Sequence, residues 1–288
     1  MSFLQVRSIF IAALLLMSCN HAEPKSVIPQ NHAIPMEYKI IWHWVDEFSF
    51  DEQEKLKNWL REITKVTRAT IGVYQFDVHY YFHLSDGNEP VPYAHTARHH
   101  NQQAVHFYVN PKFTLQDFMN DWTAQHEISH LSFPFIDRKN MWFSEGYATY
   151  MSRKIMVSQG IFNTAEFEAI YLNKIGNDPN LYQFSGVTVP ELADSLRARH
   201  QYPSIYYLGS SFFFLIDDKL QQDYGTNLAA VVSSYQKAGR LKDETLNEVL
   251  CSLDCIINST LFIDLYNDYQ TLPSEELLKY FKQNKAMY

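Results

Sequence analysis

Near the middle of the 288-residue sequence, three residues combine metal-ligand and acid–base chemistry. His126 and His130 are four positions apart, so a helix places both imidazoles on one face, about one turn apart, where they can share one metal ion. Glu127 lies beside them, and its carboxylate can take a proton from a metal-bound water that attacks a carbonyl group. Zinc suits this HExxH pattern because it lowers the pKa of such a water. A pattern with three fixed positions also arises by chance, so the surrounding residues must show whether this one is a zinc site.

A catalytic zinc ion needs a third protein ligand and one position left open for water and substrate. Glu145, fifteen positions after His130, is the best candidate. A short loop between the two segments lets the chain return antiparallel, which would bring this carboxylate to the metal. The alternative is a glutamate that only complements the dipole at the start of a helix.

The elements that must position these residues follow from the periodicity of apolar residues. The predicted strands cover residues 38–45, 73–84 and 104–109. The predicted helices cover residues 51–68, 115–131, 144–158, 205–224, 228–237, 244–251, 261–269 and 274–281. Ser49 or Asp51 is expected to cap the first helix. The sequence therefore predicts an α+β fold, with a small mixed sheet plus helices in residues 37–114 and the zinc-binding helices with a helical C-terminal subdomain in 115–288.

The N-terminus has the pattern of a targeting segment. Residues 9–17 are wholly apolar and too short to span a bilayer as a stable helix. They lead into LMSC at residues 16–19, which resembles a bacterial lipobox whose cysteine carries the lipid of the mature protein. The sequence thus predicts a signal peptide over 1–18, lipidation at Cys19 and a polar, proline-containing tether over 19–36. An ordinary secretory signal that happens to contain a cysteine is the alternative.

A lipid-modified cysteine would place the protein outside the cytoplasm, in the periplasm or at the cell surface, with the outer membrane as one candidate. Two further cysteines, Cys251 and Cys255, would then lie four positions apart in an oxidising compartment. A local disulfide between them is one interpretation. Two free buried thiols on one helical face are the other.

Composition excludes several functional classes. Apolar residues make up 46% and charged residues 19% of the chain, which is enough to form a sizeable core. Neither GxGxxG nor GxxxxGK[ST] occurs among only 9 glycines, so a glycine-rich nucleotide-binding loop is not expected. The formal net charge of −8 provides no basic surface for nucleic acid.

Residues 142–148 read WFSEGYA and add to the HExxH pattern. Together the two segments resemble the gluzincin metallopeptidases, specifically the aminopeptidase-N-like group, in which HExxH is followed by a helix with the pattern W-[LF]-x-E-G-[FY]-A. The resemblance covers about residues 115–151. It implies a zincin-like metalloprotease domain in which one Zn²⁺ is held by His126, His130 and Glu145.

A weaker match to the same family occurs at residues 206–209, which read YYLG. In that family a tyrosine three positions before a glycine donates a hydrogen bond to the oxyanion of the tetrahedral intermediate. The resemblance implies this role for Tyr206, and Tyr207 is the competing choice. The alternative for both tyrosines is packing in a helical core.

Three departures separate the sequence from the aminopeptidases. The spacing from HExxH to Glu145 is shorter, the whole chain is far shorter, and no G-x-M-E-N-like segment is present to grip a free amino group. We therefore expect a stand-alone zinc metallopeptidase that acts on peptides or proteins, with Glu127 as general base and a lipid anchor in the membrane. The alternatives are a non-catalytic zincin-fold lipoprotein acting in binding or assembly, and hydrolysis of a non-peptide amide or a cell-wall peptide stem.

The remaining polar groups carry weaker expectations. The resemblance implies that the strand at 104–109 is an edge strand that binds extended substrate, and an interior strand is the alternative. The loop histidines His95, His99 and His100 are interpreted as solvated rather than as a second metal site, and no role is assigned to His79 or His83. Solvated helix faces are predicted for Asp217, Asp218, Asp264 and Asp268.

Overall fold

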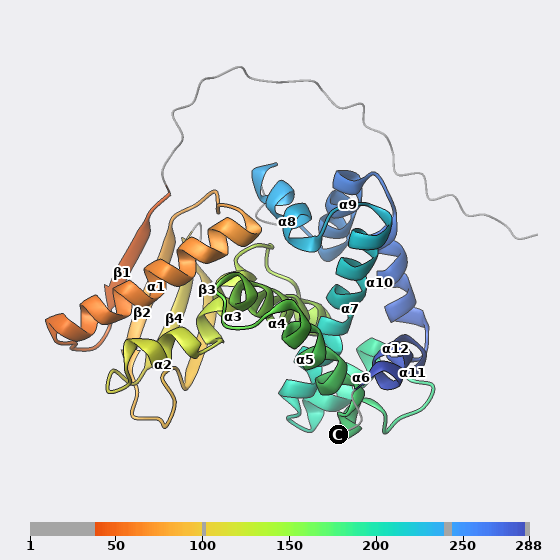
Figure 1. Ribbon diagram of the computed structural model, residues 1–288, viewed down its shortest axis with the longest axis horizontal. Coiled ribbons are helices and arrows are strands. Elements are labelled where there is room, and N and C mark those ends of the chain that lie inside the picture. The colour runs from red at the N-terminus through yellow and green to blue at the C-terminus, as the bar shows by residue number, and fades with distance from the viewer. Residues whose placement is uncertain (1–37, 100–101, 239–243, 286–288) are drawn as a thin grey trace, which may run out of the picture. The chain divides into compact units, whose positions relative to one another are not determined.

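The computed structural model describes residues 38–99, 102–238 and 244–285, which leaves the predicted signal peptide, Cys19 and the tether outside the described residues. Its sheet has four strands in the order β1-β2-β4-β3 (Figure 1). β1 (Ile40–Trp44), β2 (Val78–Leu84) and β4 (Gln102–Val109) are parallel, whereas β3 (Tyr93–His99) runs antiparallel to β4 at one edge.

One face of the sheet forms the core with α1 (Phe50–Ile71) because strand residues alternate between the two faces. Tyr80, Phe82 and Phe107 point toward the helix and are fully buried, and Trp59 of α1 meets Phe107 with ring centroids 5.3 Å apart. Ser49 begins the helix: its hydroxyl accepts from the backbone of the third helical residue, whose carboxylate accepts from the Ser49 backbone in return. The expectation of a cap at Ser49 is therefore confirmed.

Three predictions for the first half of the chain are wrong. The strand predicted at 104–109 is interior, since β4 pairs with both β2 and β3. His95 belongs to strand β3 and not to a loop. The helix predicted over 115–131 is two helices, α2 (Leu115–Asn120) and α3 (Thr123–His130). The chain is extended at Asp121, whose carboxylate accepts from the Thr123 backbone at 2.7 Å and restarts the helix there.

Helices make up the second half, as predicted, although two of them were missed. They are α4 (Met141–Ser158), α5 (Thr164–Gly176), α6 (Val189–Ala198), α7 (Tyr202–Asp223), α8 (Leu228–Lys237), α9 (Leu246–Ile257), α10 (Leu261–Thr271), α11 (Ser274–Leu277) and α12 (Lys279–Asn284). The two missed helices are α5 and α6, since no helix was predicted between residues 158 and 205. Among the described residues, no helix combines the length and apolar character that crossing a membrane requires.

α4 and α7 cross with their backbones in contact, because glycines face each other at the crossing. A Cβ atom added to Gly209 of α7 would lie 1.7 Å from the Trp142 carbonyl oxygen of α4. A Cβ atom added to Gly146 of α4 would lie 2.2 Å from the Gly209 carbonyl carbon. These glycines follow Glu145 and Tyr206 closely in the chain, so the crossing sets how near those two side chains lie.

Asp217 on α7 corrects the prediction of a solvated helix face. Its side chain is 1% exposed. One carboxylate oxygen accepts from the Tyr150 hydroxyl at 2.6 Å and pairs with Lys154 at 2.8 Å, and the other accepts from the Leu228 backbone at 2.6 Å. The carboxylate therefore joins α4, α7 and the start of α8.

Cys251 and Cys255 both lie on α9, and the structure has no bond between the two thiols. Cys251 is half-buried and Cys255 is exposed. This finding goes against the disulfide, and it also differs from the alternative of two buried thiols.

Candidate metal centre

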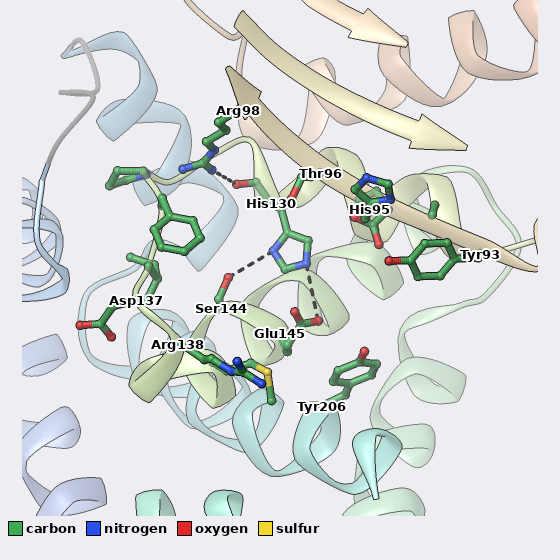
Figure 2. Close-up of a pocket in the computed structure, with 16 residues that line it drawn as sticks. Tyr93, His95, Thr96, Arg98, His130, Asp137, Arg138, Ser144, Glu145 and Tyr206 are labelled. Atoms are coloured by element: carbon green, nitrogen blue, oxygen red, sulfur yellow. Dashed lines mark hydrogen bonds and ion pairs between the residues drawn. The ribbon is translucent and has the colours of Figure 1, made fainter. Parts of the chain in front are cut away.

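Three side chains from two helices bring their ligand atoms together at one point. Figure 2 shows two of them, His130 and Glu145. The Nε2 atoms of His126 and His130 lie 3.2 Å apart. One carboxylate oxygen of Glu145 lies 3.2 Å from His126 Nε2 and 3.6 Å from His130 Nε2. Nitrogen and oxygen ligands about 2.0–2.2 Å from a tetrahedral zinc ion are separated by distances of this order. The triangle therefore fits a single Zn²⁺.

The electrostatics of this triangle favour a positive charge inside it. Burial by itself would raise the pKa of Glu145, but the adjacent imidazoles of His130 and His126 outweigh burial and hold that pKa well below its usual range. Burial would lower the pKa of His130, yet the charge and hydrogen bond of Glu145 raise it. The negative charge of Glu145, which raises the pKa of His130, would equally favour a cation bound at this point.

Neighbouring groups fix the orientation of the second histidine and the end of its helix. His130 Nδ1, the nitrogen remote from the triangle, lies 3.3 Å from the Ser144 hydroxyl. Arg98 of β3 extends to the end of α3. One of its terminal nitrogens donates hydrogen bonds to the carbonyl oxygens of His130, at 3.1 Å, and Phe133, at 2.7 Å. The C-terminus of α3 is thereby tied to the edge strand of the sheet.

The first histidine is held mainly by packing. His126 is 4% exposed, and the ring of Trp122 meets its imidazole edge-on with centroids 4.9 Å apart. Its Nδ1 atom is buried and has no hydrogen-bond partner among the described residues. Metal-binding histidines commonly donate this hydrogen to a carboxylate or carbonyl, so His126 departs from that pattern.

A cavity of about 700 Å³ opens beside the triangle (Figure 2). Glu127, His130, Glu145 and Tyr206 all line it. Glu127 is buried, and its side chain lines this cavity. The arrangement places a carboxylate and a phenol beside the metal-binding atoms, as water activation and oxyanion stabilisation require.

The two competing tyrosines of α7 have different surroundings. Tyr206 lies in the cavity, with its ring centroid 5.7 Å from that of His126. Burial, and then the charges of Glu145 and Glu127, raise the pKa of the Tyr206 phenol, so it keeps its proton at neutral pH. Tyr207 instead packs against Tyr171, with ring centroids 6.1 Å apart. The geometry favours Tyr206.

The strand beside the cavity is β3, for which the sequence analysis predicted no strand. Tyr93, His95, Thr96 and Arg98 of this edge strand line the cavity. Larger and smaller side chains alternate only in residues 93–96, and Ala97 breaks the alternation, so the sequence gives only a short strand signal here. Because β4 pairs on both sides, the strand with a free edge beside the cavity is β3 and not β4.

Comparisons with known proteins agree with this fold. No family model and no curated protein matches the sequence. Among solved structures, an aminopeptidase N family protein from Idiomarina loihiensis is 16% identical, covers 82% of this chain and 46% of its own, and has a TM-score of 0.52. The M1 zinc metallopeptidase from Deinococcus radiodurans is 13% identical, with coverages of 85% and 48% and a TM-score of 0.45. The chain thus spans about half the length of these structures.

The likeness to the Idiomarina loihiensis structure shows the fold. The predicted α+β class is confirmed, with a small four-stranded sheet and mostly helices, as in aminopeptidase N-like domains. The structure therefore combines a fold similar to that of this aminopeptidase N family protein with a cluster of His126, His130 and Glu145.

Proposed function

We propose that this protein is a zinc-dependent metallopeptidase. One observation carries the proposal: the ligand atoms of His126, His130 and Glu145 converge at the wall of a cavity that Glu127 and Tyr206 also line. A zinc ion held there would lower the pKa of a bound water and polarise the scissile carbonyl. The buried Glu127 supports catalysis over a binding role, because binding of zinc alone does not need that carboxylate.

Glu127 and Tyr206 would have different roles in the reaction. Glu127 takes a proton from the attacking water and later gives it to the leaving amine. Tyr206, whose phenol stays protonated, donates a hydrogen bond to the carbonyl oxygen as negative charge develops on it. Ser144 and Arg98 hold His130 and the end of its helix in place while this happens.

The cavity favours internal peptide bonds as substrates. An enzyme that removes N-terminal residues needs an anionic group to bind the free ammonium of its substrate. Beside the two glutamates of the centre, the only acidic residue among the described residues that line the cavity is Asp137, whose carboxylate accepts from the backbone and side chain of Asn140. The lining part of β3 carries no carboxylate. We infer an endopeptidase in which an extended segment of substrate pairs with β3.

The location of the enzyme is a separate proposal. The lipobox-like residues 16–19 support export and anchoring through lipid on Cys19, with the catalytic domain facing the periplasm or the cell exterior. Mass spectrometry of the membrane-extracted protein should find a diacylated Cys19 as the first residue. An intact N-terminus or cleavage at another position would reject the lipoprotein.

The test of the proposed function compares the wild-type protein with Glu127→Gln. Both proteins are incubated with a mixed peptide library, the products are read by mass spectrometry, and zinc is measured in both. We expect cleavage at internal bonds by the wild type, and a variant that keeps its zinc but loses cleavage. Undiminished cleavage by the variant would refute the role of Glu127. Stoichiometric zinc with no cleavage by the wild type would favour the non-catalytic zincin-fold lipoprotein.

A further inference from the structure

Charged side chains line the cavity beside the metal-binding atoms. Among the described residues, and leaving out histidines, they are Arg98, Glu127, Asp137, Arg138 and Glu145. Glu127 and Glu145 have roles in the proposed reaction, and a zinc ion bound there would offset their negative charge. Arg98 is held by the carbonyl oxygens of His130 and Phe133 at the end of α3. Asp137 and Arg138 are therefore the charged lining residues left for contact with substrate.

Asp137 is engaged with its own neighbours. One carboxylate oxygen accepts from the Asn140 backbone at 3.2 Å and from the Asn140 side chain at 2.8 Å, and the other lies 3.4 Å from the Lys139 ammonium. Figure 2 shows the Asp137 carboxylate directed away from Glu145. These hydrogen bonds hold the 3₁₀ turn Arg138–Asn140, which leads directly into α4. The backbone of Arg138 is thereby fixed at the cavity.

Arg138 presents a positive charge that the described part of the chain leaves without a carboxylate partner. The other two acids that face this region pair elsewhere, Glu145 with His126 and His130, and Asp137 with Lys139. The Arg138 side chain is exposed and lines the cavity, and Figure 2 shows it on the same side of the cavity as Glu145. A cation in this position favours a substrate that carries a negative charge.

Apolar side chains form the rest of this wall. Phe135, which is 73% exposed, lines the cavity together with Ile136 and Met141. A peptide that lies over these side chains would displace water from around the Arg138 guanidinium. Coulombic attraction between a guanidinium and a carboxylate grows as water is removed, so substrate binding itself would strengthen an ion pair formed here.

The spacing from Glu145 to Arg138 suits a substrate residue close to the scissile bond. Three residues of 3₁₀ turn and four of α helix separate them, which places their Cα atoms at most about 12 Å apart. An extended peptide covers such a distance in roughly three residues, and the length of the arginine side chain shortens it further. A carboxylate within three residues of the scissile bond would therefore meet the guanidinium.

We propose that Arg138 determines substrate specificity by binding the carboxylate of an aspartate or glutamate side chain within three residues of the scissile bond. The inference rests on the proposed peptidase function and names the class of peptide on which it acts. A guanidinium suits this role because it can bind a carboxylate through two parallel hydrogen bonds. The formal net charge of the whole chain is −8, which disfavours acidic peptides in general, so the preference depends on this local cation.

The test reads peptide selection in two ways, using a library of short peptides that lacks His and Cys and is blocked at both ends. Blocking leaves Asp and Glu side chains as the only carboxylates. In one arm the zinc-loaded wild type cleaves the library, and mass spectrometry locates each cleaved bond. In the other arm zinc-loaded Glu127→Gln captures peptides without cleaving them. We expect Asp and Glu to be enriched about fivefold near the cleaved bond and among the captured peptides.

Arg138→Glu, made in the wild type and in Glu127→Gln, should replace this selection by a preference for Lys and Arg. The matched control is Lys139→Glu, which makes the same change of charge one residue later. Lys139 is 80% exposed and is not among the residues that line the cavity, so this variant should keep the acidic preference. Circular dichroism and zinc content verify that each variant is folded and loaded.

The two arms separate failure of this inference from failure of the proposed function. Cleavage by the wild type without enrichment of Asp and Glu would overturn the role of Arg138 and leave the peptidase standing. An acidic preference that persists in Arg138→Glu, one that is also lost in Lys139→Glu, or its absence from both arms would overturn the role as well. Capture of acidic peptides that Arg138→Glu abolishes, with no cleavage by the wild type, would uphold the role and refute the peptidase.

Discussion

Replacement of Gly209 by alanine tests the contact that brings α4 and α7 together. The new methyl group would lie 1.7 Å from the Trp142 carbonyl oxygen and 2.9 Å from the Gly146 Cα atom. A carbon atom normally approaches a carbonyl oxygen no closer than about 3.3 Å, so the helices must separate by roughly 1.6 Å. Backbone atoms stand on both sides of the contact, so no side chain can turn away to relieve it.

The expected stability loss combines two opposing effects. Overpacking of a core costs about 1–3 kcal/mol, and the upper end applies where backbone meets backbone. Alanine is favoured over glycine in a helix by about 1 kcal/mol, which leaves a net loss of roughly 2 kcal/mol. For a chain of this size the unfolding temperature should fall by about 4–8 °C.

The same separation should move Tyr206 away from Glu145, since Tyr206 lies one helical turn before Gly209. A displacement of about 1 Å in a catalytic site can lower the rate roughly 100-fold. The assays are thermal unfolding, and cleavage of the fastest substrate from the peptide library at a temperature where both proteins are folded. Zinc content should not change.

Gly160→Ala is the matched control at the end of α4. Gly160 has a φ of +75° with no atom within 4 Å of an added Cβ, so alanine there costs only about 1–2 kcal/mol of backbone strain. Its cleavage rate should equal that of the wild type. Wild-type stability in Gly209→Ala would refute the close approach of the helices, and full cleavage by a destabilised Gly209→Ala would refute its link to Tyr206.

Four further outcomes follow from the structure. Tyr206→Phe should lower kcat by about 100- to 1000-fold, while Tyr207→Phe should leave kcat unchanged, and equal rates would reject the assignment. Arg98→Met removes two charge-assisted hydrogen bonds to carbonyls, so competition with a chelator should show zinc affinity lower by about 10- to 100-fold; unchanged affinity would contradict that positioning role. Asp217→Ala removes a buried carboxylate and leaves the buried Tyr150 hydroxyl, the Leu228 backbone N–H and the half-buried Lys154 without their partner, so it should cost about 3–5 kcal/mol in urea unfolding, whereas a loss below about 1 kcal/mol would mean that the network is dispensable. In the metal-free protein, the lowered pKa of Glu145 stabilises the fold above pH 4.5, and this stability is lost as the pH falls through that lowered pKa. The raised pKa of His130 stabilises the fold below pH 6.5, and this stability is lost as the pH rises through that raised pKa. The unfolding temperature should therefore be highest between pH 4.5 and 6.5, and Glu145→Gln should abolish this maximum.

The pairing of His126 and His130 in the candidate metal centre was predictable because their spacing is local. Four positions on one helix fix the relation of His126 to His130 whatever the rest of the chain does. Glu145 required the return of the next helix, which the resemblance to gluzincins implied and the contact between α3 and α4 provides. The α+β class followed from the change from strand-like to helical periodicity along the chain.

The sequence-based predictions failed where contacts between distant parts of the chain determine the local structure or the burial of a residue. Residues 93–99 form a strand because β4 pairs with them, and Arg98 of this strand donates to the carbonyl oxygen of His130 at the end of α3. Asp217 is buried because α4 and α8 supply its partners, which no pattern along α7 reveals. The break at Asp121 depends on one side chain that accepts from the backbone two residues later.

The most direct test of the metal centre is an anomalous diffraction map recorded at the zinc absorption edge from crystals grown with Zn²⁺. We predict a peak about 2.0–2.2 Å from His126 Nε2, His130 Nε2 and one carboxylate oxygen of Glu145, on the wall of the cavity that Glu127 lines. Zinc-saturated crystals with no peak within this triangle of atoms would contradict it.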